Sequence, residues 1–399
     1  MRRASKQHRS GRMSLEKCFN ISDLRAKAEK RLPTPVFQYL DGGADDEVTL
    51  RRNTAAFDDY ELLPNYLTDT SNIDLTTRAL GVEIDWPVFL SPTGMSRLFH
   101  HTGEPAVARA ADKFGTLYGL STLSTTSIED VAATTPGPKM FQIYVYKDRG
   151  LTKEFVERCR AAGYSAICLT VDVPVPGNRE RDFRTGMTIP PKFGTSSLLS
   201  FALHPEWSWH AIRDASFDLA NVGQRGDLSV KGKPVSVIQY LNDQIDRTVT
   251  WKDAEWLARE WGGQFLIKGV HSVHDAKRAA EIGAHGIMIS NHGGRQMDGV
   301  PACIDALVPI ADAVGEKLEL IVDGGIRRGS HVIKALALGA TACSIGRSYL
   351  YGLGAGGQAG VERALTILRT EIERGMALLG VTKISDITRD IIQKRGTTL

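Results

Sequence analysis

The chain has few cysteines, and their spacing matches no disulfide or metal-binding pattern. Five occur among 399 residues, none in a Cys-x-x-Cys pair: Cys18, Cys159, Cys168, Cys303 and Cys343. Neither a disulfide framework nor a metal centre is indicated, and we expect no bound metal. Unpaired thiols of this kind agree with a reducing, cytoplasmic environment.

The chain also has no apolar run long enough to span a bilayer and no strong excess of one charge. The formal net charge of +3 gives no general reason to expect a nucleic-acid partner. Basic residues are concentrated before the first acid, Glu16, so we expect residues 1–14 to form a disordered basic arm. With 42% hydrophobic residues, the remainder, residues 15–399, is expected to form one large domain.

Apolar runs typical of strands alternate with amphipathic segments typical of helices. The predicted strands are Val88–Ser91, Thr116–Ser121, Met140–Val145, Ala166–Thr170, Gln264–Lys268, Gly286–Ser290, Leu318–Asp323 and Ala342–Ile345. A predicted helix separates each strand from the next, and the last helix is expected from Val361. Eight such units predict an α/β protein with a (β/α)8 TIM barrel, whereas a doubly wound sheet gives no reason for eight. Residues 21–41 predict a helical N-terminal extension that stops at Gly42-Gly43.

The segment from 171 to 250 is too long for an ordinary connection, so we expect a functional excursion after the fourth strand. Its apolar part includes Trp207 and Trp209. Residues 190–230 are therefore expected to allow peripheral contact with a membrane. Packing on the barrel itself or on a neighbouring subunit is the alternative.

One polar cluster follows the sixth predicted strand: Ser290-Asn291-His292-Gly293-Gly294-Arg295-Gln296. In a barrel of this kind, working residues lie at the C-terminal ends of the strands. His292 offers an imidazole that takes up a proton near neutral pH, and Arg295 a guanidinium that binds a carboxylate through two hydrogen bonds. The pair suggests acid–base chemistry on a carboxylic acid. A strand cap and a surface ion pair would explain an isolated His-x-x-Arg.

Glycines and arginines after the last two predicted strands form a second pattern. Asp323-Gly324-Gly325-Ile326-Arg327 and Gly346-Arg347 combine backbone amides with positive charge, where this fold often binds phosphate. Lys268 ends the fifth strand, and a cation there would stabilise a reduced flavin. Flavin mononucleotide (FMN) is therefore the cofactor that fits best. No Gly-x-Gly-x-x-Gly opens a helix after the first strand, so a nicotinamide site is unsupported. A Schiff-base role for Lys268 would leave the His292 and Arg295 pair without a function.

These motifs resemble those of the FMN-dependent L-2-hydroxy-acid dehydrogenase/oxidase family, and most closely its bacterial L-lactate and mandelate dehydrogenases. The resemblance runs from about Leu32 to the last helix, and Ser-Asn-His-Gly-Gly-Arg-Gln is its most specific motif. It implies that His292 is the catalytic base and that Asp172, of Leu-Thr-Val-Asp, is hydrogen-bonded to it.

The resemblance also assigns the other site residues. Arg295 is expected to bind the substrate carboxylate with help from Tyr39, while Tyr144 and Arg179 lie on the substrate side. The residues expected to line the flavin are Pro92, Thr93, Gly94, Ser121, Gln142, Tyr144, Thr170, Lys268 and Ser290. Those expected to bind its ribityl and phosphate groups are Asp323, Gly324, Gly325, Arg327, Gly346 and Arg347.

Two positions depart from the pattern of glycolate oxidase, a member of the family. Gly94 replaces an alanine and Leu123 a tryptophan, which suggests a roomier pocket and favours a dehydrogenase. We therefore expect oxidation of an L-2-hydroxy acid, L-lactate, to the 2-oxo acid, with electrons passed to a quinone. The alternatives are an oxidase that produces hydrogen peroxide and a non-catalytic flavin-binding barrel. The resemblance further implies a homotetramer, cytoplasmic or peripheral at the inner face of the cell membrane.

Overall fold

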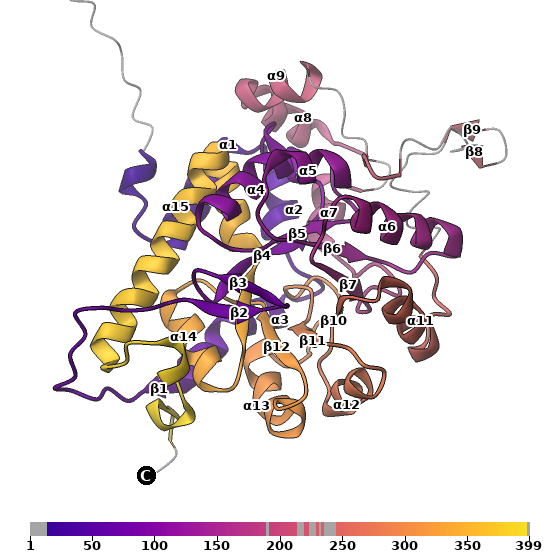
Figure 1. Ribbon diagram of the computed structural model, residues 1–399. Coiled ribbons are helices and arrows are strands. Elements are labelled where there is room, and N and C mark those ends of the chain that lie inside the picture. The colour runs from indigo at the N-terminus through magenta and orange to yellow at the C-terminus, as the bar shows by residue number, and fades with distance from the viewer. Residues whose placement is uncertain are drawn as a thin grey trace, which may run out of the picture.

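The computed structural model describes residues 14–188, 191–213, 219–222, 229–230, 233–234 and 245–396. Eight parallel strands form a closed barrel at its centre (Figure 1). They are β4 (Val88–Thr93), β5 (Tyr118–Ser121), β6 (Lys139–Ile143), β7 (Ala166–Thr170), β10 (Gln264–Lys268), β11 (Gly286–Ser290), β12 (Glu319–Asp323) and β13 (Ala342–Ile345). The pairing of β13 with β4 closes the circle. The (β/α)8 prediction is confirmed, and the doubly wound alternative is wrong.

Helices surround the strands. They are α4 (Gly103–Lys113), α5 (Ile128–Thr134), α6 (Arg149–Ala161), α11 (Trp251–Trp261), α12 (Val273–Glu281), α13 (Cys303–Val314), α14 (Gly329–Ala337) and α15 (Arg347–Leu379). Side-chain caps fix several starts: Ser127 and Ser272 each accept a hydrogen bond of 3.0 Å from the backbone N–H three residues later. The last helix begins at Arg347, not at Val361 as expected. Gly356 and Gly357 interrupt it with non-helical backbone angles, so the sequence pattern resumes only beyond them.

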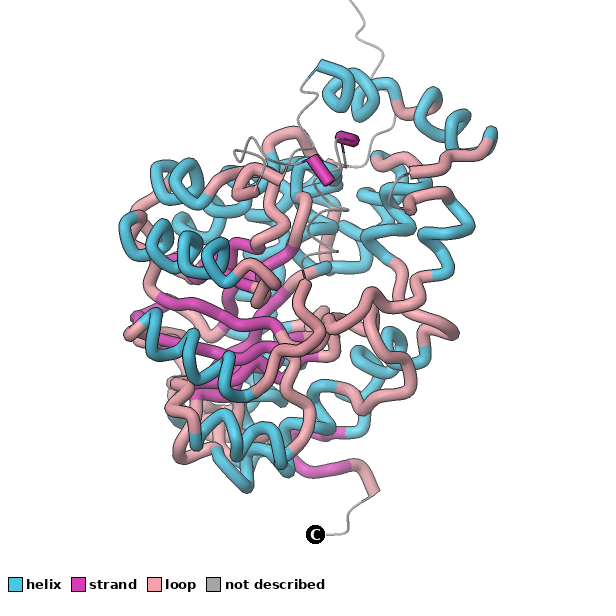
Figure 2. Tube along the Cα trace, turned by 90° about the vertical axis from the view of Figure 1, so that its right-hand side faces the viewer, coloured by secondary structure: helices cyan, strands magenta, loops and turns pink. Residues whose placement is uncertain are grey.

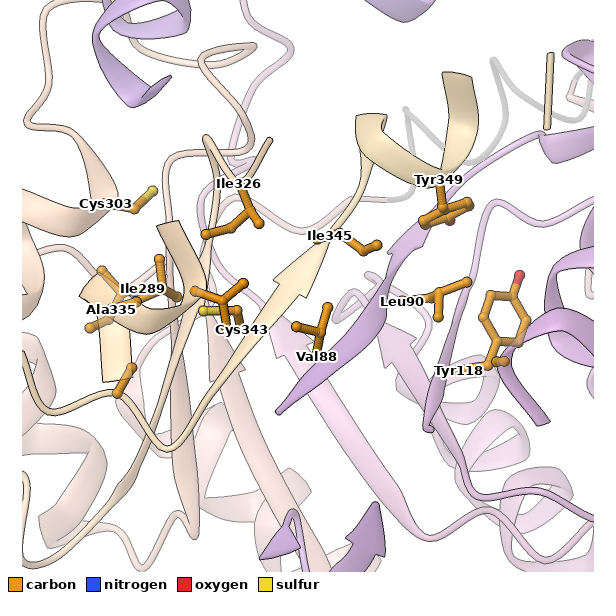
Figure 3. Close-up of a cluster of buried hydrophobic side chains, with 14 of the residues drawn as sticks. Val88, Leu90, Tyr118, Ile289, Cys303, Ile326, Ala335, Cys343, Ile345 and Tyr349 are labelled. Atoms are coloured by element: carbon orange, nitrogen blue, oxygen red, sulfur yellow. The ribbon is translucent and has the colours of Figure 1, made fainter. Parts of the chain in front are cut away.

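Alternating side chains of the strands fill two separate apolar layers. Val88 and Leu90 of β4 point outward and pack in the layer between strands and helices (Figure 3). Phe89 points inward and joins the barrel interior, which is filled by Met140, Cys168, Leu266, Met288, Ile321 and Ala342. A hairpin of β2 (Thr77–Ala79) and β3 (Val82–Ile84) packs against this interior cluster, and Leu80 N–H donates to Glu319 at the start of β12. The N-terminal end of the barrel is thereby closed, which leaves the opposite end for a site.

The N-terminal extension consists of α1 (Ile21–Arg31), α2 (Thr34–Asp41) and α3 (Val48–Ala55), and α1 lies along α15 (Figure 1). Asn20 caps α1 by accepting from Asp23 N–H, and Pro35 stands in the first turn of α2. Gly42 ends α2, as the sequence predicts.

The excursion after β7 contains α7 (Glu180–Thr185), α8 (Thr195–Ala202) and α9 (Pro205–Arg213), followed by the short strands β8 (Ser229–Val230) and β9 (Lys233–Pro234). Both views place α8 and α9 apart from the barrel strands, at the top of the molecule (Figures 1 and 2). Across the described residues, no helix has the length and apolarity to cross a bilayer. The basic arm predicted at residues 1–14 falls, except for Ser14, outside the described residues.

Candidate active site

His292 follows the end of β11 in a backbone conformation that few side chains adopt. Its φ is 57°, and Gly293 and Gly294 continue the left-handed path with φ of 65° and 72°. A left-handed conformation at a residue other than glycine is uncommon, and such residues are enriched at functional sites. The turn leaves the His292 side chain 29% exposed at the C-terminal mouth of the barrel.

The imidazole of His292 is paired with Asp172, two residues beyond the end of β7. Nδ1 lies 3.1 Å from Asp172 Oδ1. Burial lowers the pKa of His292, and the Asp172 carboxylate opposes this shift without cancelling it. Burial acts to raise the pKa of Asp172, but His292 and Lys268 hold it below its ordinary value. At pH 7 a neutral imidazole thus donates its Nδ1–H to an ionised carboxylate, which leaves Nε2 as a proton acceptor.

The guanidinium of Arg295 is held at one nitrogen and offers the others. Nη1 donates to the carbonyl oxygens of Tyr39 at 2.6 Å and Gly42 at 3.0 Å. Its carbon also lies 4.9 Å from the centre of the Tyr39 ring, and Arg179 lies 5.5 Å from the same ring. Both of these backbone hydrogen bonds are made by Nη1, so Nε and Nη2 remain for a ligand. These two N–H groups form the edge that binds a carboxylate in bidentate fashion.

Lys268 forms a buried ion pair on the floor of the mouth. Its Nζ lies 2.9 Å from Ser290 Oγ and 3.1 Å from Asp323 Oδ2. Burial acts to lower the pKa of Lys268, but Asp323 and Asp172 raise it above the ordinary value. Ser344 Oγ donates to the other Asp323 oxygen at 2.5 Å. A lysine kept cationic by carboxylates is a fixed positive charge and does not form a Schiff base, which requires a neutral amine.

Polar atoms on neighbouring strands are aimed at the mouth without protein partners. Ser121 Oγ donates to Gln142 Oε1 at 3.1 Å, which turns the amide nitrogen Nε2 away. Gln142 Nε2 and Thr170 Oγ1 are buried and have no hydrogen-bond partner. A buried polar atom of this kind costs free energy unless a ligand satisfies it. Tyr144, just beyond β6, is also buried, and burial raises its pKa, so its hydroxyl stays neutral.

The loop after β12 follows a backbone path that requires glycine, and its contact with phosphate stays a prediction. Gly324 and Gly325 have φ of 154° and 77°, and a Cβ on Gly325 would lie 1.9 Å from the carbonyl oxygen of Asn53. Arg327 Nη1 donates to Ile326 O at 2.9 Å, beside the start of α15.

Arg347, after β13, is differently engaged. Its guanidinium donates to the carbonyl oxygens of Leu40, Gly293 and Gly42 at 3.0, 2.8 and 2.7 Å. This side chain ties the N-terminal extension to the His292 loop, a function that the sequence did not suggest. Its phosphate contact remains a prediction.

Two of the expected flavin neighbours, Thr93 and Gly94, contact residues of other elements. Thr93 Oγ1 and the Tyr349 hydroxyl are 2.5 Å apart. A Cβ on Gly94 would lie 3.0 Å from Leu123 Cβ, and Met95 N–H donates to Leu123 O. The two departures from glycolate oxidase therefore touch each other and shape one corner of the mouth.

Three supporting residues were not assigned from the sequence. Gln296 Nε2 donates to the carbonyl oxygens of Asp172 and Val175, which fixes the loop that carries the carboxylate. Asn291 exchanges two amide hydrogen bonds with Asn53, at 2.7 and 2.8 Å. Gln296 and Asn291 belong to the polar cluster, so their position in it was the available signal.

The His292–Asp172 pair, the Arg295 guanidinium, the buried Lys268 ammonium and the unsatisfied polar atoms of Gln142 and Thr170 thus lie at the same end of the barrel. The donor set fits FMN, because Gln142 and Thr170 supply unsatisfied hydrogen-bonding atoms and Lys268 supplies a positive charge. Among the described residues, no group of side chains is arranged to hold a metal ion.

Comparisons with known proteins agree with this reading. The model of the FMN-dependent dehydrogenase family matches residues 28–394. The L-lactate dehydrogenase of Yersinia pestis (strain Pestoides F) is 41% identical over 381 residues, which cover 94% of this chain and 98% of that relative.

Solved structures give the same result. The monotopic membrane protein (S)-mandelate dehydrogenase matches with a TM-score of 0.90 and 36% identity, covering 95% of this chain and 100% of its own. A lactate oxidase of Pediococcus acidilactici matches with a TM-score of 0.80 and 32% identity, covering 95% of each chain. With this match in sequence and fold, and with a site suited to its cofactor, the chain belongs to the FMN-dependent dehydrogenase family of oxidoreductases, which act on CH–OH groups with FMN as cofactor.

Proposed function

We propose that the protein oxidises L-lactate to pyruvate and passes the electrons to a quinone. The observation that carries the substrate class is the joint presence of the His292–Asp172 pair and the open edge of Arg295 at one mouth. A 2-hydroxy acid needs both, because its carboxylate has to be held while a proton leaves the neighbouring carbon or hydroxyl. The choice of lactate is supported by the 41% identity to an L-lactate dehydrogenase.

In this proposal, Arg295 binds the substrate carboxylate through Nε and Nη2. The hydrogen bonds from Nη1 to the carbonyl oxygens of Tyr39 and Gly42 hold the guanidinium in one position. His292 Nε2 accepts the substrate proton, and the adjacent carboxylate of Asp172 stabilises the imidazolium that forms. A positioned base typically contributes about 10²–10⁴-fold in rate. FMN, when bound, supplies the two-electron acceptor, and Tyr144 offers a neutral hydroxyl donor to the substrate.

The remaining site residues are proposed to hold the cofactor. Lys268 provides a fixed positive charge, supported by its contacts with Ser290 and Asp323. The residues proposed to surround FMN are Pro92, Thr93, Gly94, Ser121, Gln142, Thr170 and the phosphate loops at 323–327 and 346–347. Arg179, stacked on Tyr39 and paired with Asp182, is proposed to border the substrate.

A quinone acceptor is supported by the excursion. Helix α9 and the turn that joins it to α8 expose Leu203, Trp209 and Ile212, which are 69%, 63% and 75% exposed. An apolar surface on a short helix pair is typical of proteins that rest in a membrane interface. One similar structure is itself described as a monotopic membrane protein. We also propose that residues 15–399 form one domain and that the protein assembles as a homo-oligomer.

The function is tested by anaerobic mixing of the purified flavoprotein with L-lactate, D-lactate, glycolate and (S)-mandelate. We expect L-lactate to bleach the flavin absorbance fastest, followed by rapid reoxidation with a quinone and slow reoxidation in air. Fast reoxidation in air with release of hydrogen peroxide would show an oxidase instead. No bleaching with any hydroxy acid would refute the assigned reaction.

The membrane contact is tested by co-sedimentation with liposomes. Leu203→Glu with Ile212→Glu should release the protein into the supernatant, because each change places a charge in the apolar surface. Leu378→Glu is the matched control, since Leu378 is 66% exposed on α15, far along the chain from the excursion. Binding that survives in the double variant but disappears at high salt would instead point to electrostatic attachment.

A further inference from the structure

A second hollow lies beside the active site, between the end of α1, the loop after β4 and helix α9 of the excursion. Its cavity volume is about 50 Å³, and the cavity opens to solvent. We call it the histidine pocket, and its walls include Arg31, Phe99, His100, His101, Trp207 and His210. The proposed lactate chemistry uses none of these residues.

Three imidazoles form a continuous stack along one wall. The ring centres of His100 and His101 are 4.4 Å apart, and those of His101 and His210 are 3.8 Å apart with planes inclined by 11°. His100 lies over Gly357, where the interruption of α15 makes room for its ring. A Cβ on Gly357 would approach His100 Cε1 to 2.7 Å at a φ of 61°. The pocket is therefore shaped by a specific break in the last helix.

The outer wall is built from the excursion. Trp207 Nε1 donates to Leu98 O at 2.8 Å, and Glu206 pairs with Arg31 at 2.6 Å, so α9 is fastened across the pocket. The same helix carries the exposed Trp209 and Ile212. A ligand dissolved in a lipid interface would thus reach the pocket along the surface proposed to rest there.

The inner wall leads to the substrate site. Phe99 lines the pocket and stacks on Tyr39 with ring centres 6.4 Å apart. The opposite partner of Tyr39 is Arg295, at 4.9 Å. Two aromatic side chains therefore separate the histidine pocket from the carboxylate clamp.

The charged groups that line the pocket are Arg31, Arg97 and Glu206. Burial lowers the pKa of His100 to about 4, and His101 and Arg31 add to this shift. His100 is therefore uncharged at pH 7, and because its Nδ1 is hydrogen-bonded to Thr102 Oγ1 at 2.8 Å, only Nε2 can serve a ligand. The charge of Arg31 is balanced by Glu206. A flat, uncharged ring with hydrogen-bonding oxygens matches the stacked imidazoles, since aromatic faces and polar edges are both satisfied.

We propose that the histidine pocket holds the ring of a benzoquinone acceptor, with imidazole N–H groups on its carbonyl oxygens. The inference rests on the proposed quinone acceptor and deepens it by locating the acceptor site. The hydroxy acid gives up two electrons and two protons as its C–H and O–H bonds break and its carbon–oxygen bond becomes a carbonyl. The quinone takes up two electrons by way of FMN and two protons, and its two carbonyls become the hydroxyls of a quinol.

The decisive variant is Ala211→Phe, which fills the pocket from the partly exposed face of α9. Ala202→Phe is the matched control, because it makes the same change at an exposed position of α8 outside the pocket. The probe is a short-chain ubiquinone analogue, added to the holoenzyme while its tryptophan fluorescence is recorded. We expect Ala211→Phe to raise the dissociation constant of the quinone at least about tenfold, and Ala202→Phe to leave it within about twofold.

A second measurement separates the acceptor site from the substrate site. The prereduced holoenzyme is mixed with the quinone or with ferricyanide, a water-soluble acceptor that needs no ring pocket. Ala211→Phe should slow reoxidation by the quinone about tenfold and reoxidation by ferricyanide much less. His210→Leu, which keeps the bulk and removes the hydrogen bonds, should also weaken quinone binding.

The outcomes distinguish the two proposals. If the parent protein transfers electrons to the quinone and Ala211→Phe binds and reacts as the parent does, the pocket assignment is wrong and the proposed acceptor stands. If the parent neither binds nor reduces the quinone although lactate bleaches the flavin, both the acceptor and the pocket are wrong. If inorganic phosphate, and not the quinone, changes the fluorescence, the pocket is an anion site and the inference is overturned.

Discussion

Replacing Asp172 by asparagine tests how much the negative charge of Asp172 contributes to proton abstraction by His292. The substitution keeps the size of the side chain and its packing against Gly269, where a Cβ would lie 2.7 Å from Asp172 Cβ. It removes only the charge next to His292 Nδ1, 3.1 Å away. The backbone carbonyl of residue 172 still accepts from Gln296, so the loop is expected to keep its position.

The size of the effect follows from the distance between the charges. A carboxylate and an imidazolium about 4 Å apart attract by about 4 kcal/mol at the effective dielectric constant of a protein surface. Asp172 is only 12% exposed, so solvent screens little of this attraction. Since about 1.4 kcal/mol corresponds to a factor of ten, removal of the charge should slow proton abstraction by about a thousandfold. The affinity for substrate should change little, because Arg295 is untouched.

The assay is stopped-flow bleaching of the flavin under anaerobic conditions, at several lactate concentrations, with protein shown to retain FMN and its parental melting temperature. The limiting rate of bleaching measures proton abstraction by His292, and its dependence on lactate concentration measures substrate binding by Arg295. We expect the limiting rate to fall about a thousandfold with a nearly unchanged dissociation constant. A limiting rate within threefold of the parent would falsify the assignment of Asp172 as the group that stabilises the imidazolium.

Three further perturbations test other parts of the structure. Arg295→Lys should raise the KM for lactate by about a hundredfold with a smaller loss of kcat, because a point charge replaces the bidentate fork; steady-state kinetics would measure this, and an unchanged KM would contradict it. The rate of flavin bleaching should fall at acid pH with a midpoint below about pH 6.5, because the folded pKa of His292 lies below its ordinary value and protonation removes the base; a midpoint above about pH 7 would contradict the lowered pKa. Asp41 accepts from Arg25 and Tyr351, which hold its pKa down against the raising effect of burial. Asp41→Asn should therefore lower the free energy of unfolding by about 3 kcal/mol at pH 7. The difference between parent and variant should shrink as the pH falls below the ordinary aspartate pKa and vanish below the lower folded pKa, and urea titrations at pH 7 and at acid pH would measure it.

The regular parts of the barrel were predictable because their physical signal is local. Gln264–Lys268 and Gly286–Ser290 were bounded correctly, since short buried strands appear as apolar runs between polar ends. The last helix was placed too late because Gly356 and Gly357 break the amphipathic pattern, whereas tertiary packing makes Arg347 to Ala355 helical.

The candidate site was predictable where one loop carries several functional groups, as the His292 loop does. The pairing of Asp172 with His292 joins two strand ends, and the sequence placed it only through a family resemblance. The use of Arg347 as a tie between loops was not predictable, because its partners are backbone carbonyls, and carbonyls have no sequence signature. The histidine pocket was missed for a similar reason: His210 lies far along the chain from His100 and His101, and only folding brings the three rings together.

The seating of the N-terminal extension also sets the order in which the enzyme can become complete. Gly42 accepts hydrogen bonds at its carbonyl oxygen from Arg295 and Arg347, which are made 253 and 305 residues later. The N–H of Ala44 likewise donates to the carbonyl oxygen of Gly294, which is also made much later. A growing chain can therefore form its first strands and helices while the proposed carboxylate clamp is still incomplete, and the clamp is completed only when these distant segments meet.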